Sequence, residues 1–600
     1  MMNFQEQQKL YAQPLPSTRT GLFFNTFPYP TKISPEAIAL YIAVHTKPGD
    51  TVLDVFGGSG STGLAALICE HPTEKMLKLA QKLKVSPEWG PRNAVLYEIG
   101  KYGSFAAKVI CHPPDEQEFQ AAAQDFFAKA KNELGWLYQT RSADGHDGFI
   151  RHVIWSDLLF CPNCHAEVAY YDLAVERAPM KIKDHGRCPQ CLFQQKIEDF
   201  PSQLETVYDQ LLGQTITRKK RVPVLVYGQT GKGKWVRPVN EVDWSLLQTI
   251  EAELKFDRLE PQKINWGDLY RSGYHTGISH LHHFYTKRNF YVMSKLWALT
   301  DHYSTKVREA LRLVLLSYNA AHSTLMTRVV VKKRSKDFVV TSAQSGVLYI
   351  SSLPVEKNII VGTERKLKNF AAVFQYIRQC KGKVRVLNQS SEKLALPDQS
   401  IDYIFTDPPF GGFIPYAEVN QINELWLGEP TAQEHEIIIS SAQNKNVDTY
   451  EKMMTKVFTE MNRVLKDGAQ ATVIFHSSKT EVWEAFVRSV AAANFVVKET
   501  SFLNKTQASF KQVVSKVSVQ GDPVILLAKG RPKTADPRAI STLDEAIQSS
   551  YERKIKDTRL IYTRYLTSCL EKGVPIEMGA KEAYEYIEQR IGVLTGEQSG

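Results

Sequence analysis

The stretch Ile404-Phe405-Thr406-Asp407-Pro408-Pro409-Phe410-Gly411 decides how this 600-residue chain is interpreted. The apolar residues 403–405 predict a buried strand, and the two prolines end it because proline has no N–H to donate. In open α/β sheets, ligands bind at the carboxyl ends of strands. At that position Asp407 and the proline carbonyls are hydrogen-bond acceptors, and Phe410 offers a flat face. This set suits a planar base with an exocyclic amino group.

The four residues Asp407, Pro408, Pro409 and Phe410 resemble the (Asp/Asn/Ser)-Pro-Pro-(Tyr/Phe) motif of S-adenosylmethionine-dependent methyltransferases that act on exocyclic amino groups of nucleic-acid bases. The resemblance implies that these four residues are catalytic. Asp407 and the Pro408 carbonyl would accept the two N–H bonds of the amino group, and Phe410 would stack on the base. Taken alone, four residues also fit a strand followed by a proline turn, so the rest of the chain must decide.

A strand, a glycine-rich turn and a helix are predicted at residues 51–56, 57–63 and from 64 onward. Glycines let the backbone approach a ligand closely, and a helix N-terminus favours negative groups. The spacing differs from dinucleotide and phosphate loops. It resembles the Asp-x-Phe-x-Gly-Ser-Gly loop that holds S-adenosylmethionine in the same methyltransferases, although an ordinary tight turn is the alternative. The candidate cofactor-binding residues are Phe27, Thr31, Asp54, Phe56, Gly57, Gly58, Ser59, Gly60, Glu98 and Ser390.

Four of these candidates lie away from the glycine turn and its strand. Glu98 ends the second expected strand, residues 93–97, where such folds bind ribose hydroxyls. A solvated strand-end glutamate is the alternative. Phe27 and Thr31 belong to a Pro/aromatic segment that resembles the cofactor-flanking motif of the family. Ser390 follows the delayed third strand, residues 384–387, where the family contacts the adenine of the cofactor; the aspartate often found there is absent.

Two Cys-x-x-Cys pairs, Cys161/Cys164 and Cys188/Cys191, are separated by 23 residues. Four thiolates at this spacing predict a tetrahedral zinc site. A closed four-sulfur site indicates a structural rather than a catalytic ion. We expect the neighbouring His165 and His185 not to be ligands.

A basic stretch follows a short segment, residues 204–212, that is expected to be helical. Residues 228–234 formally fit a Gly-x-x-x-x-Gly-Lys phosphate loop, but Trp235 replaces the required Ser or Thr, so a β-hairpin is predicted instead. No acidic residue occurs from 218 to 237, which favours contact with a nucleic-acid backbone, with a solvated basic hairpin as the alternative. The candidate nucleic-acid-binding residues are Arg218, Lys219, Lys220, Arg221, Lys232 and Lys234.

Residues 271–289 are rich in histidine, which invites a second metal site. No acid or cysteine joins these histidines at a useful spacing, so a hydrogen-bonded loop or a base-stacking surface is expected. Residues 284–289, Phe-Tyr-Thr-Lys-Arg-Asn, resemble a segment of large bacterial DNA methylases that carry a zinc ribbon.

The fold class expected is α/β: a seven-stranded Rossmann-like methyltransferase sheet, interrupted after its second strand by a large insertion with a four-cysteine zinc ribbon, and followed by a helical C-terminal tail. The later strands are expected at residues 402–405, 472–476, 495–498 and 523–528. The expected divisions are residues 20–103 and 351–531 for the methyltransferase halves, 104–350 for the insertion with its ribbon at 158–195, and 532–600 for the tail.

Composition sets broad limits. The chain is 43% hydrophobic, lacks a run of eighteen apolar residues and begins with a polar stretch, so a cytoplasmic protein with no membrane association is expected. A net charge of +10 mildly favours a polyanionic partner. Eight cysteines in so long a chain do not indicate a disulfide scaffold.

The resemblance implies a site-specific DNA methyltransferase that uses S-adenosylmethionine and structural Zn²⁺, acting on the N6 of an adenine flipped out of duplex DNA. Its expected setting is restriction–modification or phage defence, with a nuclease or helicase as a possible partner protein. The alternatives are cytosine-N4 methylation, methylation of tRNA or rRNA, and a non-catalytic, zinc-dependent DNA-binding subunit.

Overall fold

The computed structural model describes residues 4–12, 14–17, 20–256, 259–332, 335–477, 479–505, 522–531, 543–552, 558–572, 574, 576 and 578–595. The chain forms two compact units. The first, here called the sheet unit, comprises Met1–Pro113, Ala372–Ala417 and Thr431–Gly600. The second, the insertion unit, comprises Pro114–Ala371 and Glu418–Pro430.

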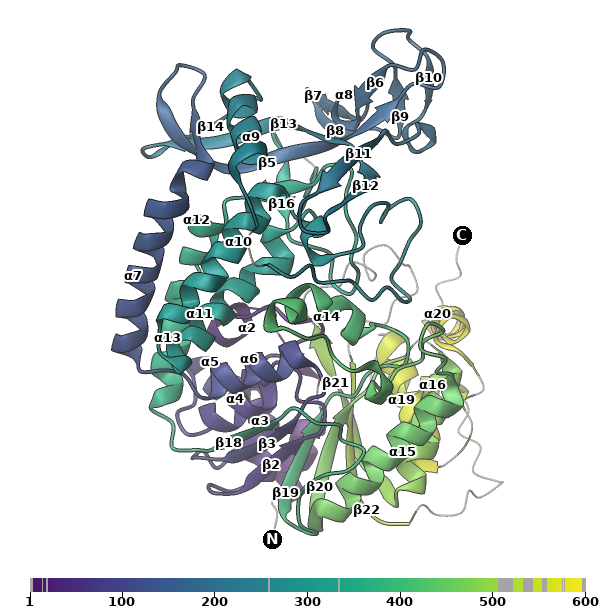
Figure 1. Cartoon of the computed structure of the whole chain (residues 1–600). Coiled ribbons are helices and arrows are strands. Elements are labelled where there is room, and N and C mark those ends of the chain that lie inside the picture. Colours follow the sequence, from purple (N-terminus) through teal and green to yellow (C-terminus); the bar gives the residue numbers. More distant parts are fainter. Residues whose placement is uncertain are drawn as a thin grey trace. The chain divides into compact units, whose positions relative to one another are not determined.

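The sheet unit is built on an eight-stranded sheet with the order β1-β21-β22-β20-β19-β2-β3-β18. Strands β20, β19, β2, β3 and β18 are parallel neighbours, whereas β22 runs antiparallel to β20 and β21. Figure 1 shows the purple β2 and β3 beside the green β19 and β20, so the two expected methyltransferase halves share one sheet. The strands are β1 (Leu15–Ser17), β2 (Thr51–Asp54), β3 (Asn93–Tyr97), β18 (Val384–Leu387), β19 (Ile401–Thr406), β20 (Leu465–Ile474), β21 (Phe495–Lys505) and β22 (Asp522–Lys529).

All seven strands expected from the sequence are present in this sheet, but the expected number of seven is wrong. The eighth strand is β1, which pairs in parallel with the end of β21. A three-residue segment containing a proline has no strand pattern of its own, and it joins the sheet only because β21 offers a free edge.

Buried apolar runs explain why the central strands form. In β19 the side chains of Ile401, Tyr403, Ile404 and Phe405 are all buried, and Tyr403 lies opposite Val52 of β2. Continuous apolar runs are typical of parallel strands that are covered on both faces. The helices of the sheet unit before the insertion are α1 (Phe4–Tyr11), α2 (Leu22–Asn25), α3 (Pro35–His45), α4 (Ser61–Ile68), α5 (Glu74–Leu83) and α6 (Lys101–Cys111).

The C-terminal helices are part of the sheet unit's core. Ile561, Tyr565 and Ile587 are buried in the same apolar cluster as Leu53 of β2 and Val473 of β20. The expected tail therefore contributes to folding of the sheet unit. The helices after the insertion are α15 (Val447–Val464), α16 (Thr480–Ala492), α18 (Leu543–Glu552), α19 (Thr558–Lys572) and α20 (Ala580–Thr595). Two further helices, α13 (Leu367–Arg378) and α14 (Tyr416–Glu424), cross the boundaries between the units.

The insertion unit contains an antiparallel sheet with the order β14-β13-β5-β17, and β4 and β6 also pair with β5. These strands are β4 (Gln139–Arg141), β5 (Asp147–Phe160), β6 (Glu167–Ala169), β13 (Arg221–Thr230), β14 (Gly233–Pro238) and β17 (Val355–Lys357). Two-stranded ribbons are β7 (Val175–Arg177) with β8 (Met180–Ile182), β9 (His185–Arg187) with β10 (Gln194–Lys196), β11 (Leu204–Asp209) with β12 (Gln214–Lys219), and β15 (Arg328–Val330) with β16 (Val339–Thr341). The helices are α7 (Glu116–Leu134), α8 (Tyr170–Ala174), α9 (Glu241–Glu253), α10 (Lys287–Leu299), α11 (Thr305–Tyr318) and α12 (Ile359–Glu364).

Two local predictions in this unit have opposite outcomes. The hairpin predicted in place of a phosphate loop is present as β13 and β14, with Thr230 opposite Gly233. The helix expected at residues 204–212 is wrong, because Leu204–Asp209 is strand β11, paired with β12 along its whole length. Alternating exposure along β11 and its β-branched residues Thr206 and Val207 favour a strand.

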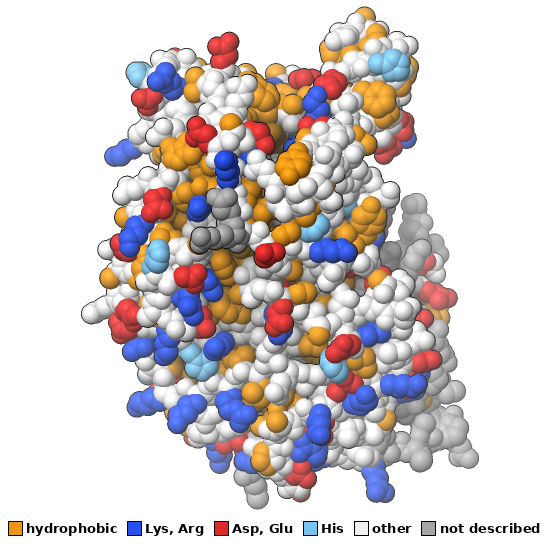
Figure 2. All heavy atoms as spheres, in the orientation of Figure 1, with side chains coloured by type: hydrophobic (Ala, Val, Ile, Leu, Met, Phe, Trp, Pro, Cys, Tyr) orange, Lys and Arg blue, Asp and Glu red, His pale blue; other side chains and the backbone are white. Residues whose placement is uncertain are grey.

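The unit boundaries differ somewhat from the expected divisions. The insertion unit starts at Pro114 and ends at Ala371, and it also takes in Glu418–Pro430. Among the described residues, no helix combines the length and apolar character needed to cross a membrane. On the face drawn in Figure 2, Lys and Arg side chains are interspersed with Asp and Glu, so the net charge of +10 is not gathered there into one basic field.

Candidate functional site

The predicted site residues of the sheet unit lie at one edge of its sheet. Strands β19, β2, β3 and β18 are parallel neighbours, so their carboxyl ends meet at the same edge. The segments that follow them carry Asp407, the glycine turn 57–60, Glu98 and Ser390. The structure therefore brings together residues that are more than 300 positions apart in the sequence.

Asp54 anchors the glycine turn to the neighbouring elements. One carboxylate oxygen accepts hydrogen bonds from the Phe56 N–H (3.0 Å) and the Thr406 hydroxyl (2.7 Å), and the other accepts from the Thr62 hydroxyl (2.6 Å). Burial raises the pKa of Asp54, and these hydrogen bonds act against that shift. Asp54 thus joins the ends of β2 and β19 to the start of α4, and its hydrogen bonds fix the two ends of the glycine turn.

Glu98 holds the glycine turn from the neighbouring strand. Its two oxygens accept the N–H groups of Gly58 (2.7 Å) and Gly100 (2.6 Å), and the N–H of Gly57 donates to the Tyr97 carbonyl (2.8 Å). Gly58 has a φ of 49° and Gly60 a φ of 87°, conformations that glycine adopts at little cost. Each carboxylate oxygen can accept about two hydrogen bonds, so Glu98 can hold the turn and also accept from a ligand hydroxyl.

The segment after β18 is fastened to the same edge. The Asn388 amide donates to the carbonyls of Glu98 and Ile99 (2.8 and 2.9 Å), and the Ser391 hydroxyl donates to the Val55 carbonyl. Ser390 lies between them and accepts a weak bond from the Glu392 N–H at 3.3 Å. The half-buried Ser390 therefore lies in a segment that is fastened to the end of β3 by Asn388 and to the end of β2 by Ser391.

The Pro/aromatic segment reaches the same region. Phe27 is fully buried, with its ring 5.2 Å from that of Tyr102. Thr31 lies 2.7 Å from the Tyr416 hydroxyl, oxygen to oxygen, and adopts a φ of 57°. That backbone conformation costs a β-branched residue about 1–3 kcal/mol, and such strain clusters at functional sites. The Tyr29 and Tyr416 rings are nearly parallel, with centroids 6.4 Å apart.

Asp407 follows β19 directly, and the two prolines turn the chain. The buried Tyr450 hydroxyl donates to the Pro409 carbonyl at 2.7 Å, which fixes the turn from α15. The Phe410 ring packs edge-on against Phe475 (centroids 5.6 Å apart) and His476 (6.1 Å). T-shaped contacts of this kind hold the orientation of the Phe410 ring.

Two residues of this site, Tyr416 and Glu436, have no role predicted from the sequence. One Glu436 oxygen accepts the Ala417 N–H (2.9 Å) at the start of α14, and the other accepts from the Gln443 amide (2.6 Å). Burial raises the pKa of Tyr416 well above its usual range, and the negative charges of Asp407, Glu98 and Glu436 add to that shift. Burial also raises the pKa of Glu436. The carboxyl groups of Asp407, Glu98 and Glu436 thus lie close enough to Tyr416 to influence its ionisation.

The four cysteines of the insertion unit converge. The Sγ atoms of Cys161 and Cys191 are 3.6 Å apart, those of Cys164 and Cys188 are 3.8 Å apart, and all four lie within 4.8 Å of one another. The two Cys-x-x-Cys segments share one backbone hydrogen-bond pattern. The N–H of His165 donates to the Cys161 carbonyl (2.8 Å), and that of Leu192 donates to the Cys188 carbonyl (3.0 Å). Four sulfurs at these separations fit a tetrahedral zinc ion. Among the described residues, the cluster consists of the four cysteines and includes neither His165 nor His185.

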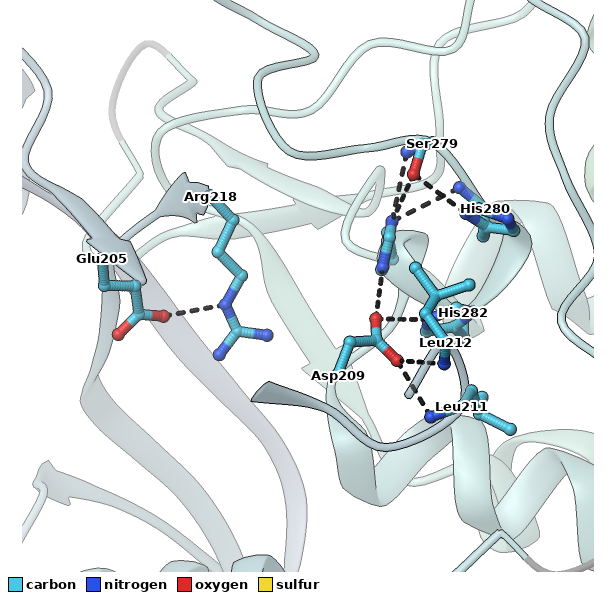
Figure 3. A network of polar contacts seen from close by, with 9 residues as sticks. Glu205, Asp209, Leu211, Leu212, Arg218, Ser279, His280 and His282 are labelled. Carbon is cyan, nitrogen blue, oxygen red and sulfur yellow. Dashed lines mark hydrogen bonds and ion pairs between the residues drawn. The ribbon is translucent and has the colours of Figure 1, made fainter. Parts of the chain in front are cut away.

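The histidine-rich segment is joined by an acid that the sequence did not suggest. Asp209, at the end of β11, accepts hydrogen bonds from the Nε2 atoms of His282 and His283, both at 2.8 Å (Figure 3). Its other oxygen accepts the N–H groups of Leu211 and Leu212. Burial raises the pKa of Asp209, but these hydrogen bonds outweigh it and hold the pKa well below its usual range.

These three side chains could surround a metal ion, but the protonation of the His283 ring favours direct hydrogen bonds to Asp209 instead. The Nδ1 atom of His283 accepts the N–H groups of Ser279 (3.1 Å) and His280 (3.3 Å). A neutral imidazole that accepts at Nδ1 carries its proton at Nε2, so it donates to Asp209 and has no lone pair there for a metal. The expected hydrogen-bonded loop fits this geometry.

The predicted basic stretch at residues 218–221 lies against carboxylates from other strands. Arg221 Nε is 2.7 Å from Asp157, and Lys219 Nζ is 3.8 Å from the same carboxylate. Lys220 is 2.9 Å from Glu167, and Arg218 is 2.8 Å from Glu205, as Figure 3 also shows. At the hairpin tip, Lys232 and Lys234 are exposed, and neither has an ion pair with a described residue. The two parts of the predicted nucleic-acid surface therefore differ in available charge.

The parallel sheet and the two loops at its edge are consistent with a methyltransferase. A family model described as DNA methylase, for the N6/N4 methyltransferases, matches residues 5–71 and 401–578. These stretches contain the glycine turn and Asp407–Phe410 but not Glu98, Ser390 or the cysteine cluster, and they amount to less than half of the chain. Over them the chain is similar to DNA methylases, which supports DNA methyltransferase activity and does not distinguish adenine from cytosine.

Solved structures with similarity to the chain are also methyltransferases. A protein of Thermoplasma acidophilum, provisionally assigned as a methyltransferase, is 14% identical with a TM-score of 0.15, over 28% of this chain and 54% of its own. Geranyl diphosphate C-methyltransferase from Streptomyces coelicolor A3(2) is 10% identical with a TM-score of 0.16, over 26% of this chain and 59% of its own. The chain thus spans only a little over half of each, and similarities this low carry no weight here. No curated protein matches the chain.

Proposed function

We propose that this chain transfers a methyl group from S-adenosylmethionine to the exocyclic N6 of an adenine in duplex DNA. The observation that carries the proposal is the placement of two loops at adjacent strand ends: the glycine turn after β2 and Asp407–Phe410 after β19. The match to the DNA methylase family covers both loops.

The residues of the first loop fit the cofactor. Gly58 and Gly60 hold backbone conformations that open the turn, and Glu98 presents a carboxylate that can accept from ribose hydroxyls. The carboxylates of Asp407 and Glu98, which both act on Tyr416, would favour a sulfonium cation. When bound, S-adenosylmethionine supplies an electrophilic methyl group on that sulfonium.

Asp407 and the Pro408 carbonyl would accept the two N–H bonds of the target amino group. Accepting both bonds would draw the nitrogen lone pair out of conjugation with the base, so that the lone pair could form the new N–C bond as the sulfur–carbon bond of the cofactor breaks. The excess proton leaves from the nitrogen toward Asp407. The face of Phe410 would stack on the base, and Tyr450 keeps the turn rigid by its bond to Pro409. Positioning and fixed polar groups supply the rate enhancement.

A base in duplex DNA must leave the helix before it can reach these residues. Flipping costs a few kcal/mol, which stacking and hydrogen bonds to the flipped base offset. Adenine is preferred over cytosine because the first motif position is Asp407 rather than serine, an association taken from the family resemblance. We place the DNA-backbone contacts of the hairpin at Lys232 and Lys234, since Arg218, Lys219, Lys220 and Arg221 already face carboxylates.

The cysteine cluster is proposed to bind one structural zinc ion. Its four sulfurs close the coordination sphere, so no open position is available for catalysis. Cys161 and Cys188 are buried in a small apolar cluster of the insertion unit, which would lose its organising centre without the metal. A setting in restriction–modification or phage defence, with a nuclease or helicase partner, is the extension of this proposal that the family resemblance implies.

The test is a labelling experiment with purified protein. The chain is incubated with methyl-labelled S-adenosylmethionine and DNA from a methylation-deficient bacterium, and the nucleosides are separated by mass spectrometry. Label in N6-methyladenine is expected. Label in N4-methylcytosine would show that cytosine and not adenine is the target, and label only in added RNA would contradict a DNA substrate.

The matched control is Asp402→Ala. Asp402 lies near the amino end of the same strand, β19, where it binds the Thr51 N–H (3.0 Å) and Lys466 (2.5 Å). This variant loses a carboxylate from β19 but should keep its activity, whereas Asp407→Ala should lose it.

A further inference from the structure

A cluster of four cationic side chains, here called the cationic cluster, lies in the insertion unit and has no part in the features described so far. Arg151 is on β5, Lys357 ends β17, and Arg365 and Lys366 directly follow α12. Lys357 lies opposite His152 where β17 pairs with β5, and Arg151 is near enough to Arg365 for the charge of Arg365 to help lower the Arg151 pKa.

His322 lies beside Lys357 and is influenced by Lys366 and Arg365 as well. Lys357 Nζ is 2.7 Å from His322 Nδ1. Because an ammonium group can only donate, Nδ1 is the acceptor and the imidazole is neutral. Burial lowers the pKa of His322 to about 3, and the charges of Lys357, Lys366 and Arg365 contribute to the shift. The bond therefore orients Lys357 but does not neutralise it.

The acids that are closest in sequence are engaged elsewhere. Glu356 accepts from the Thr286 hydroxyl (2.6 Å) and the Trp155 indole (3.0 Å). Glu364 pairs with Lys131 at 2.6 Å. Within the part of the chain that the structure describes, none of the four cations of the cluster forms an ion pair, in contrast to residues 218–221. The positive charge of this cluster is thus uncompensated.

Partial burial makes this arrangement costly for the protein alone. Burial lowers the pKa of Lys357 to about 8, with a contribution from Arg365, and burial also lowers the pKa values of Lys366 and Arg151. The position of Arg365 and Lys366 at the C-terminus of α12 offsets part of the cost through the helix dipole. The dipole does not account for Arg151 or for Lys357.

Two further observations indicate a built site. The buried Nε2 of His152, opposite Lys357, has no hydrogen-bond partner among the described residues. Gly362 lies against the Tyr318 ring so closely that a Cβ there would overlap it, and this ring packs on His322 with centroids 4.6 Å apart. The glycine of α12 thus allows the ring to support the histidine that orients Lys357.

We propose that the cationic cluster binds phosphate groups of the DNA backbone. Several close cations without carboxylates suit an anion with several acceptor oxygens, and Arg365 is exposed, so a polymer phosphate can reach it. This inference rests on the proposed function and adds to it a second backbone-contacting surface, remote in sequence from the hairpin tip.

The experiment measures how salt weakens DNA binding. The full-length chain is titrated onto a fluorescent DNA duplex by anisotropy at several NaCl concentrations, and the logarithm of the binding constant is plotted against the logarithm of the salt concentration. Each lost phosphate contact reduces the steepness of this line by about 0.9. The double variant Arg365→Gln/Lys366→Gln should therefore bind more weakly and give a line less steep by about 2.

The matched control is Lys129→Gln/Lys306→Gln, which removes two exposed lysines from helices α7 and α11 of the same unit. Its line should match that of the unaltered chain. If the cluster double variant does not fold, Arg365→Gln alone replaces an exposed side chain and should change the steepness by about 0.9.

Each possible result either supports or overturns the binding of DNA phosphates by the cationic cluster. An unchanged salt dependence for the cluster variants, with normal DNA binding by the unaltered chain, overturns the binding of DNA phosphates by the cationic cluster and leaves the proposed function standing. Failure of the unaltered chain to bind DNA overturns both. Calorimetric binding of inorganic pyrophosphate that is lost in the double variant while the DNA line is unchanged would assign the cluster to a free phosphate ligand and overturn the DNA assignment.

Discussion

Replacing Glu98 by alanine should weaken cofactor binding without unfolding the protein. The carboxylate accepts two backbone N–H bonds, from Gly58 at 2.7 Å and Gly100 at 2.6 Å, and Gly58 belongs to the turn that would wrap the cofactor. Without the side chain these bonds between the turn and the end of β3 are lost, and so is the acceptor proposed for the ribose hydroxyls. The turn must then become ordered when the cofactor binds, and this lowers the affinity for the cofactor.

The size of the effect follows from the number and kind of bonds. A hydrogen bond to a charged group contributes about 1.5–3 kcal/mol. Because Glu98 is partly exposed, water replaces some of this, and a total loss of about 2–3 kcal/mol is expected for the two bonds. At about 1.4 kcal/mol for each factor of ten, the dissociation constant should rise about 30- to 140-fold.

Isothermal calorimetry with S-adenosylmethionine measures this change directly. Asp402→Ala is again the matched control, because that carboxylate also accepts a backbone N–H, from Thr51 at 3.0 Å, but at the amino end of the strands. The control should bind the cofactor as the unaltered chain does. Equal affinities for Glu98→Ala and the control would refute the role given to Glu98.

Three other outcomes are expected. Tyr450→Phe removes the donor to the Pro409 carbonyl and should lower stability by about 1 kcal/mol and kcat several-fold, measured by urea unfolding and steady-state methylation. Cys164→Ser should reduce zinc, measured by atomic emission, from one ion per chain toward none, whereas His282→Ala should leave it at one; two ions per chain would contradict the direct hydrogen bonds to Asp209. Burial lowers the pKa of His45 to about 4, so the unfolded chain binds this proton first, and stability should fall by roughly 2–3 kcal/mol as pH decreases from about 6.5 to 4. Urea midpoints of His45→Leu should show a smaller pH dependence than those of the unaltered chain.

Sequence patterns identified the sheet unit well because its signals are local. Strands β2 and β19 are apolar runs that end in glycine or proline turns, and such runs reveal buried strands without knowledge of their partners. Strand β1 was not expected because three residues with a proline form a strand only beside β21. Its existence depends on a partner far away in the sequence.

In the site, too, residues in local motifs could be predicted, whereas residues placed by distant contacts could not. The loops carrying Gly58 and Asp407 follow recognisable motifs, and their adjacency follows from the parallel sheet. The contributions of Tyr416 and Glu436 could not be predicted, because they arise from contacts with Thr31 and Ala417 across the fold.

Charge and metal predictions were limited for a related reason. The stretch 218–237 contains no acid, yet Asp157 and Glu167 approach its cations from neighbouring strands. Similarly, no acid accompanies the histidines in sequence, but Asp209 reaches His282 from 73 residues away. Counting charges within a segment does not reveal which partners folding brings to it.

Single-molecule sequencing is the sharpest test of the proposal that Asp407 directs methyl transfer to a base of DNA. Genomic DNA is sequenced from a methylation-deficient bacterium that expresses the chain, alongside the Asp407→Ala and Asp402→Ala variants. We expect N6-methyladenine in one sequence motif for the unaltered chain and Asp402→Ala, and none for Asp407→Ala. Methylation that persists in Asp407→Ala, or is absent from all three strains, would contradict the proposal.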